Sequence, residues 1–215
     1  MSELKDFQKT FIELALESNA LEFGEFTLKS GRSSPYFFNA AKMLSGCDLY
    51  KLANCYVDAI EEADLAFDCL YGPAYKGIFL GSIVAMIYSQ RGTPCPVSFN
   101  RKEIKDHGEG GNIIGTNPSG NVLIIDDVLS AGTAAKESIE NIESLNAIPK
   151  LFVVGLDRQE KGNGEISAKK ELENNFNISV TSIIDLDALI RFSNNNKNFN
   201  SYVLLLEKYR DNWGA

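Results

Sequence analysis

Two adjacent carboxylates follow a fully apolar stretch of the sequence. Residues 122–125 are all apolar, and Asp126 and Asp127 come directly after them. A short loop containing Gly132 leads to Thr133, where a helical pattern begins. The first N–H groups of a helix lack partners within it, and its dipole favours an anion there. Carboxylates repel phosphate and should face another part of the same ligand. The pattern therefore favours a sugar phosphate, with ribose hydroxyls or a divalent cation at the aspartates.

Two other nucleotide-binding motifs are excluded, and one structural explanation stays open. The P-loop pattern G-x-x-x-x-G-K-[ST] does not occur, so the aspartates are not the acidic partner of a P-loop. The nearest approach to the Rossmann pattern G-x-G-x-x-G, residues 162–167, lies in a charged segment rather than after a strand. The structural alternative is that Asp126 and Asp127 simply end a strand and Thr133 caps a helix.

The segment 101–115 combines cations with glycines. Three permanent cations and the only histidine of the chain lie within seven residues: Arg101, Lys102, Lys105 and His107. Four glycines lie at positions 108, 110, 111 and 115. Stretches of this composition are commonly solvated loops, and that interpretation stays open beside a mobile segment that closes over a ligand.

Hydrophobic periodicity predicts the elements that position these residues. Residues 3–18 and 49–60 have helical spacing, and residues 23–28 and 35–39 look like two strands joined by a turn. From residue 66, short apolar strands alternate with helices: strands at 67–71, 97–99, 122–125, 151–156 and 178–184, and helices at 78–89, 133–145 and from 187. This alternation is typical of an α/β fold with a mainly parallel sheet flanked by helices. Ligands of such sheets bind beyond the carboxyl ends of the strands, here residues 72–77, 126–133 and 157–158.

Composition limits the class of protein. The 215 residues are 44% hydrophobic and 23% charged, which is ordinary for a soluble single domain. A net charge of −8 argues against nucleic-acid binding, and no apolar run is long enough to cross a membrane. The first six residues lack the apolar stretch of a signal peptide, and the four cysteines form no C-x-x-C pair. We therefore expect a reduced, cytoplasmic protein without a structural zinc site.

Five stretches, in order along the chain, resemble one family. Residues 122–134 resemble the motif by which type I phosphoribosyltransferases bind 5-phosphoribosyl 1-diphosphate (PRPP). The others resemble orotate phosphoribosyltransferases in particular: residues 26–32 with 34–39 (FTLKSGR, SPYFFN), 72–77 (GPAYKG), 100–111 (NRKEIKDHGEGG) and 156–160 (LDRQE). Five motifs in the family's order make this resemblance highly specific.

The resemblance implies a fold and an activity. The fold would be that of type I phosphoribosyltransferases in a single domain, residues 1–215, with a small N-terminal hood at 20–45 and a mobile lid loop at 100–115. The activity would be Mg²⁺-dependent transfer of 5-phosphoribosyl from PRPP to N1 of orotate, giving orotidine 5-monophosphate and pyrophosphate in UMP biosynthesis. A homodimer is implied, in which the lid of one subunit reaches the site of the other.

The resemblance also assigns roles to residues. The implied catalytic residues are Lys105, Asp126, Asp127 and His107, the last without an assigned proton transfer. The implied PRPP-binding residues are Tyr75, Lys76, Arg101, Lys102, Lys105, His107, Asp126, Asp127, Val128, Leu129, Ser130, Ala131, Gly132, Thr133 and Ala134. The implied orotate-binding residues are Lys29, Phe37, Phe38, Ser130 and Arg158. Mg²⁺ would be held through PRPP and water rather than directly by the protein.

Two rival functions are weighed against this assignment. A phosphoribosyltransferase for a purine base would have no orotate carboxylate to pair with Lys29 and Arg158. A non-catalytic PRPP sensor could keep the aspartates while losing the lid cations, all of which are present here. Without the resemblance, Phe37 and Phe38 would be assigned to core packing and Lys29 to a solvated turn.

The sequence departs from the family pattern at three positions. Ser130 stands where many relatives have threonine, and the hydroxyl group is retained. Ile104 and Phe79 stand where a small residue and a proline are expected. Ile104 places an apolar side chain in a polar segment, which leaves the closure kinetics of the lid open.

Overall fold

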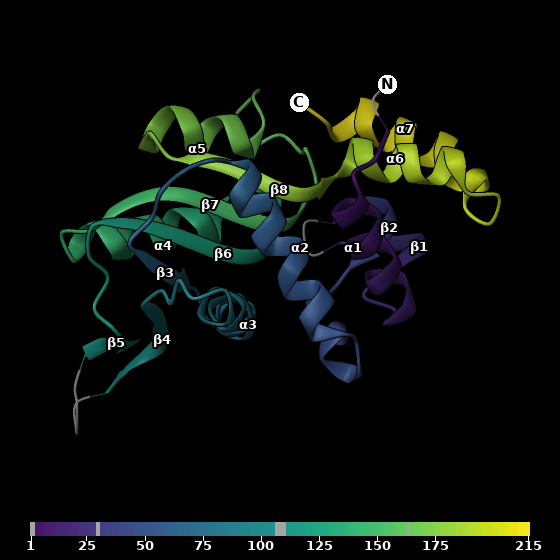
Figure 1. Cartoon of the computed structure of the whole chain (residues 1–215). Coiled ribbons are helices and arrows are strands. Elements are labelled where there is room, and N and C mark those ends of the chain that lie inside the picture. Colours follow the sequence, from purple (N-terminus) through teal and green to yellow (C-terminus); the bar gives the residue numbers. More distant parts are fainter. Residues whose placement is uncertain (1–2, 29–30, 106–110, 163) are drawn as a thin grey trace.

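A six-stranded, mainly parallel sheet forms the centre of the molecule (Figure 1). The computed structural model describes residues 3–28, 31–105, 111–162 and 164–215. The strand order is β5-β4-β3-β6-β7-β8. The strands are β3 (Cys69–Gly72), β4 (Val97–Lys105), β5 (Gly111–Gly115), β6 (Asn121–Leu129), β7 (Ile148–Asp157) and β8 (Ser179–Asp185). All neighbours pair in parallel except β5, an antiparallel edge strand on β4. The predicted α/β fold is confirmed.

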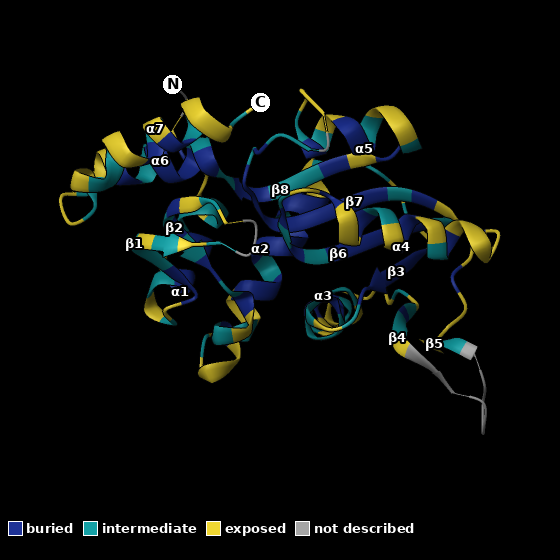
Figure 2. Cartoon of the chain, turned by 180° about the vertical axis from the view of Figure 1, so that it is seen from behind, coloured by how far each residue is buried: buried dark blue, intermediate teal, exposed yellow. Residues whose placement is uncertain are grey.

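Helices cover both faces of this sheet. Alternate residues of β6 face opposite sides, so Leu123 and Ile125 join one hydrophobic cluster while Val122 and Ile124 join another. The first cluster includes residues of α1 (Asp6–Glu17), α2 (Leu49–Glu62) and α3 (Lys76–Gln90). The second includes residues of α4 (Thr133–Ser144) and α5 (Ala168–Phe176). Burial on both faces explains why the central strands are apolar without alternation, as the dark blue strands of Figure 2 show.

A small antiparallel sheet lies beside the C-terminal helices. Strands β1 (Leu21–Thr27) and β2 (Ser33–Phe38) pair with each other and lead into a 3-10 helix, Ala40–Ser45. Helices α6 (Leu186–Asn195) and α7 (Val203–Trp213), joined through a 3-10 turn at Asn200–Tyr202, pack near these strands, and α7 contacts β2 directly (Figure 1). The two ends of the chain therefore build one region together.

The structure corrects three sequence-based boundaries. Strand β6 runs to Leu129, so Asp126 and Asp127 lie within the strand rather than beyond it. Strand β4 continues to Lys105 and β5 begins at Gly111, so the prediction of a loop was wrong for the described parts of 101–115. These backbones pair across a hairpin, and such pairing overrides the weak strand preference of charged residues. Helices α5 and α7 were not predicted.

Two further observations concern the character of the chain. The four cysteines, Cys47, Cys55, Cys69 and Cys95, are all free thiols. Among the helices that the structure describes, none combines the length and the apolar character that a bilayer crossing requires.

Candidate active site

The two carboxylates of β6 lie close to a lysine at the start of helix α3. Strand β3 ends at Gly72, and helix α3 begins at Lys76. The Lys76 ammonium lies 2.6 Å from Asp127 Oδ2, and the Asp127 side chain is only 5% exposed. The Asp127 N–H donates to Asp126 Oδ1 at 2.9 Å. The structure thus brings Lys76, Asp126 and Asp127 together, as residues of one site must be.

Asp126 has a strongly perturbed pKa. Burial and, next in size, the charge of Asp127 raise the pKa of Asp126 to about 7. The Asp127 N–H and the charge of Lys76 act in the opposite direction but are outweighed. A carboxylate held in such a place gains most from a ligand that donates hydroxyl protons or brings positive charge.

The loop between β3 and α3 is held by a side chain that the sequence analysis did not single out. The Ala74 N–H donates to Asn100 Oδ1 of β4 at 2.8 Å. A Cβ atom at Gly72 would lie 2.1 Å from the carbonyl oxygen of Gly77, so this tight turn requires glycine. Tyr75 is 70% exposed. The signal available in the sequence was that Asn100 is a polar residue in the NRKEIK stretch, which lies opposite the GPAYKG stretch.

One cation of β4 lies against the loop between β3 and α3. The Lys102 ammonium lies 5.1 Å from the centre of the Tyr75 ring, within cation–π range. Arg101 Nε is buried and has no hydrogen-bond partner among the described residues. The backbone of Lys105 ends β4, while His107 lies outside the described residues. Lys102 is therefore brought to the loop that carries Tyr75, whereas Arg101, its neighbour in the strand, points to the other face of β4.

The loop after β6 leaves the start of α4 open to a ligand. Gly132, the residue before the helix, has φ +80° and forms no side-chain cap, while Thr133 is the first helical residue. The alternative that Thr133 caps this helix is therefore wrong. Because Ala131, Thr133 and Ala134 are exposed, the unpaired N–H groups of the first turn are accessible to an anion.

The first part of the predicted phosphate motif belongs to the sheet. Val128 and Leu129 pair with Leu156 and Asp157 of β7, and Leu129 is 2% exposed. The Leu129 carbonyl accepts the Arg158 N–H at 3.0 Å. The structure therefore separates these two residues from the loop that begins at Ser130, although it places Ser130 beside Arg158.

The predicted orotate residues are divided between core and site. Phe38 is 8% exposed, with its ring centroid 6.0 Å from that of Phe11 in the core. Phe37 points to the other side of β2, with its ring centroid 5.6 Å from that of Phe26. The core-packing alternative therefore describes Phe38, whereas Phe37 is half-buried. Lys29 lies outside the described residues.

Arg158 is buried in a polar cluster directly after β7. Its side chain is 6% exposed, and its Nε donates to Glu160 Oε1 at 2.6 Å. Its Nη2 donates to Ser34 of β2 at 3.1 Å and to the Tyr209 hydroxyl of α7 at 2.9 Å. Glu160 belongs to the LDRQE stretch that carries the family resemblance, but no binding or catalytic role was predicted for it. Tyr209 carried no sequence signal, because it is 51 residues away.

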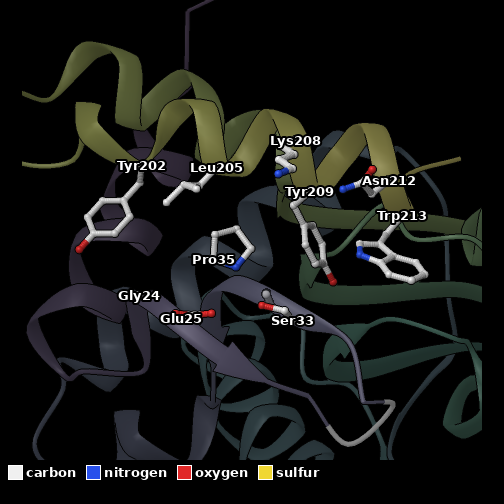
Figure 3. Close-up of a pocket in the computed structure, with 11 residues that line it drawn as sticks. Gly24, Glu25, Ser33, Pro35, Tyr202, Leu205, Lys208, Tyr209, Asn212 and Trp213 are labelled. Atoms are coloured by element: carbon white, nitrogen blue, oxygen red, sulfur yellow. The ribbon is translucent and has the colours of Figure 1, made fainter.

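A separate cavity lies between the N-terminal strands and α7 (Figure 3). Its volume is about 560 Å³, and it is lined by Gly24, Glu25, Ser33, Ser34, Pro35, Tyr202, Leu205, Lys208, Tyr209, Asn212 and Trp213. None of the predicted site residues lines it. The site at the strand ends has the chemistry of a phosphate and ribose site, so the cavity is not assigned to the reaction.

The residues at the strand ends suit a metal ion held mainly by substrate. The described residues contain no group of three or more His, Cys, Asp or Glu side chains placed to hold a metal ion. Mg²⁺ usually retains several waters and binds through one or two carboxylates plus substrate phosphates. The raised pKa of Asp126 fits such a partner, because a nearby cation favours the charged carboxylate. Binding of Mg²⁺ through PRPP and water stays a prediction.

The curated proteins whose sequences resemble this chain at 45–50% identity are named orotate phosphoribosyltransferase. No family model matches the chain. The orotate phosphoribosyltransferase of Marinobacter nauticus is 50% identical over 212 residues, which cover 99% of this chain and 100% of that protein. The crystal structure of the orotate phosphoribosyltransferase of Francisella tularensis is 38% identical, with a TM-score of 0.84 over 95% of this chain and 99% of that one. An orotate phosphoribosyltransferase of Mycobacterium tuberculosis in complex with PRPP shares the fold, with 18% identity and a TM-score of 0.62 over 84% of this chain and 98% of that one. On full-length similarity to its relatives, the chain belongs to the orotate phosphoribosyltransferase family.

Proposed function

We propose that the site at the carboxyl ends of β3, β6 and β7 carries out the family reaction. Orotate N1 loses its proton to solvent and attacks C1 of the PRPP ribose, the bond from C1 to the pyrophosphate oxygen breaks, and orotidine 5-monophosphate and pyrophosphate are released in pyrimidine biosynthesis. The observation that carries the proposal is the cluster of Lys76, Asp126 and Asp127 beside the uncapped start of α4.

The aspartates act on the ribose. Asp126 and Asp127 accept hydrogen bonds from the 2- and 3-hydroxyl groups, while the loop from Ser130 to Ala134 binds the 5-phosphate. As pyrophosphate departs, C1 gains oxocarbenium character, and the nearby carboxylates favour this positive charge. Burial supports the role, because few water molecules compete at Asp127, which is 4% exposed.

The loop between β3 and α3 acts on the leaving group. Lys76 exchanges its contact with Asp127 for the pyrophosphate, and Tyr75 and Lys102 hold it from the β4 side. Lys76 is suited to this exchange because it is 39% exposed and can reach solvent from its present position. Mg²⁺, bound with PRPP, would neutralise part of the pyrophosphate charge.

Orotate would lie between the hood and the end of β7. Ser130 and Arg158 are neighbours there through the bond from the Arg158 N–H to Leu129. Phe37 borders the ring, with Phe38 contributing through its backbone, and Lys29 completes the set. A buried guanidinium favours an anionic base such as orotate over a neutral purine, which supports orotate as the acceptor.

The β4–β5 hairpin acts as the lid. Lys105 and His107 close over PRPP and reach the site of the second subunit, so the enzyme acts as a homodimer. Each chain is a single domain, and the enzyme is cytoplasmic. Closure would exclude water, which otherwise hydrolyses the activated ribose. The exposed edge position of β5 supports a moving element, because an edge strand leaves the sheet at the smallest loss of pairing.

The reaction is tested by the loss of orotate absorbance. Orotate, uracil, adenine and hypoxanthine are each incubated with the protein, PRPP and Mg²⁺, and each reaction is repeated without PRPP and with a chelator. We expect only orotate to be consumed, and only with both PRPP and Mg²⁺ present. Turnover of a purine instead of orotate would contradict the assigned base. PRPP binding without turnover of any base would indicate the sensor.

A further inference from the structure

The turn after β7 and the facing side of α7 form a buried polar cluster that contains an ion pair. Arg158 and Glu160 are each 5% exposed, and Tyr209 is 4% exposed. The Arg158 guanidinium is stacked on the Tyr36 ring, with 4.3 Å between Cζ and the ring centre. Burying an ion pair costs desolvation energy that its attraction rarely exceeds, so such a pair is a poor source of stability. Another role is therefore needed to explain it.

Glu160 is the shared partner of the polar groups in this cluster. Glu160 Oε1 receives hydrogen bonds from Arg158 Nε and from the Tyr209 hydroxyl. Glu160 Oε2 lies 3.2 Å from the Arg32 guanidinium. Two arginines thus share the Glu160 carboxylate, and the Asp157 carboxylate, whose pKa is raised chiefly by burial, lies close enough for the charge of Glu160 to raise that pKa further. The cluster therefore offers an anionic ligand a hydrogen-bond donor rather than an excess charge.

The hydrogen bonds of Arg158 leave one nitrogen for such a ligand. Nε is bonded to Glu160, and both donors of Nη2 have an acceptor, in Ser34 and in Tyr209. Nη1 forms no hydrogen bond to any residue that the structure describes. Because three residues fix the plane of the guanidinium, the direction of Nη1 is fixed as well.

Tyr209 is itself held firmly in place. The Lys161 N–H donates to the Trp213 carbonyl at 3.1 Å, and the Ala215 N–H donates to the Gln159 carbonyl at 3.2 Å. These bonds fasten the end of the chain to the turn that follows Arg158. The end of α7 is therefore anchored by contacts other than the Tyr209 hydroxyl.

We propose that Glu160 and Tyr209 are positioning residues, which hold the Arg158 guanidinium with Nη1 toward orotate. The C-terminal helix thereby contributes to recognition of the base without touching it. This inference rests on the proposed role of Arg158 in orotate binding.

The test compares the KM for orotate with the KM for PRPP. Tyr209→Phe removes one hydroxyl, and Glu160→Gln removes one charge. Each should raise the KM for orotate about tenfold, roughly the value of one hydrogen bond to a charged group. The KM for PRPP and kcat should stay within about twofold, because neither residue is proposed to contact PRPP or the reacting atoms. Tyr202→Phe, also on the cavity side of this region, is the matched control and should change none of these values.

The outcomes separate the two proposals. An unchanged KM for orotate in both variants, with a raised KM in Arg158→Ala, would overturn the positioning role but leave Arg158 as an orotate ligand. An unchanged KM for orotate in Arg158→Ala would overturn the role of Arg158 and the inference with it. If all variants of the cluster, Arg158→Ala included, had a lower Tm but unchanged KM and kcat values, the cluster would serve stability alone. If Glu160→Gln does not fold, Tyr209→Phe and Ser34→Ala decide the question, because each removes one uncharged partner of Nη2.

Discussion

Asp126 should make the protein less stable as the pH rises. Its pKa is raised from 3.8 to about 7 in the folded state by burial and by Asp127. Between these values the folded state binds more protons than the unfolded state, so the free energy of unfolding falls as the pH increases. At 1.36 kcal/mol for each unit of pKa difference, the loss between pH 5 and pH 8 is about 2 to 3 kcal/mol.

Asp126→Asn should abolish this loss. The amide stays neutral at every pH and can still accept the Asp127 N–H through its oxygen. Relative to the wild-type protein, the variant should therefore gain about 2 to 3 kcal/mol more stability at pH 8 than at pH 5. Its kcat/KM should fall at least about tenfold, since it loses a carboxylate that favours the transition state.

Urea unfolding at pH 5, 6.5 and 8 measures the effect, without PRPP and at a fixed protein concentration. Asp211→Asn, at an exposed position of α7, is the matched control and should follow the pH dependence of the wild-type protein. The reasoning would be refuted if Asp126→Asn and the wild-type protein lost stability in parallel between pH 5 and pH 8. A variant that is more destabilised at pH 8 would refute it as well.

Three other changes test separate parts of the site. Lys76→Met should cost about 1 to 3 kcal/mol of stability in urea unfolding, because it leaves the buried Asp127 carboxylate without its ion-pair partner, and Asp127→Asn in the same chain should restore part of the loss. Gly132→Ala should cost about 1 kcal/mol of stability and weaken PRPP binding in calorimetry, since an L-residue is strained at φ +80°. An unchanged affinity for PRPP would contradict binding of the 5-phosphate by the loop from Ser130 to Ala134. Lys105→Ala should lower kcat more than about tenfold, or at least about 1.4 kcal/mol. Mixing Lys105→Ala with Asp127→Asn subunits should restore partial activity if sites are shared, whereas inactive heterodimers would argue for self-contained subunits.

Much of the fold follows from local pattern. The apolar runs at 122–125 and 151–156 predict buried strands because strands covered on both faces carry few polar residues. Their carboxyl ends indicate where a ligand binds, and the structure brings Asp126, Asp127 and Lys76 together there. The element ends were less predictable. Strand β6 includes both aspartates since its partner β7 continues to pair with it as far as Leu129.

The sequence by itself determined the fold class, the family and the types of residue at the strand ends, because these depend on periodicity and on motifs that are contiguous in the chain. Only the tertiary structure decided what those residues contact. Phe37 and Phe38 are identical neighbours in sequence, yet one packs in the core and the other faces away, because successive residues of a strand point to opposite sides. Tyr209 meets Arg158 only when α7 folds back onto the turn after β7. No local pattern encodes that contact, because it depends on how distant elements pack.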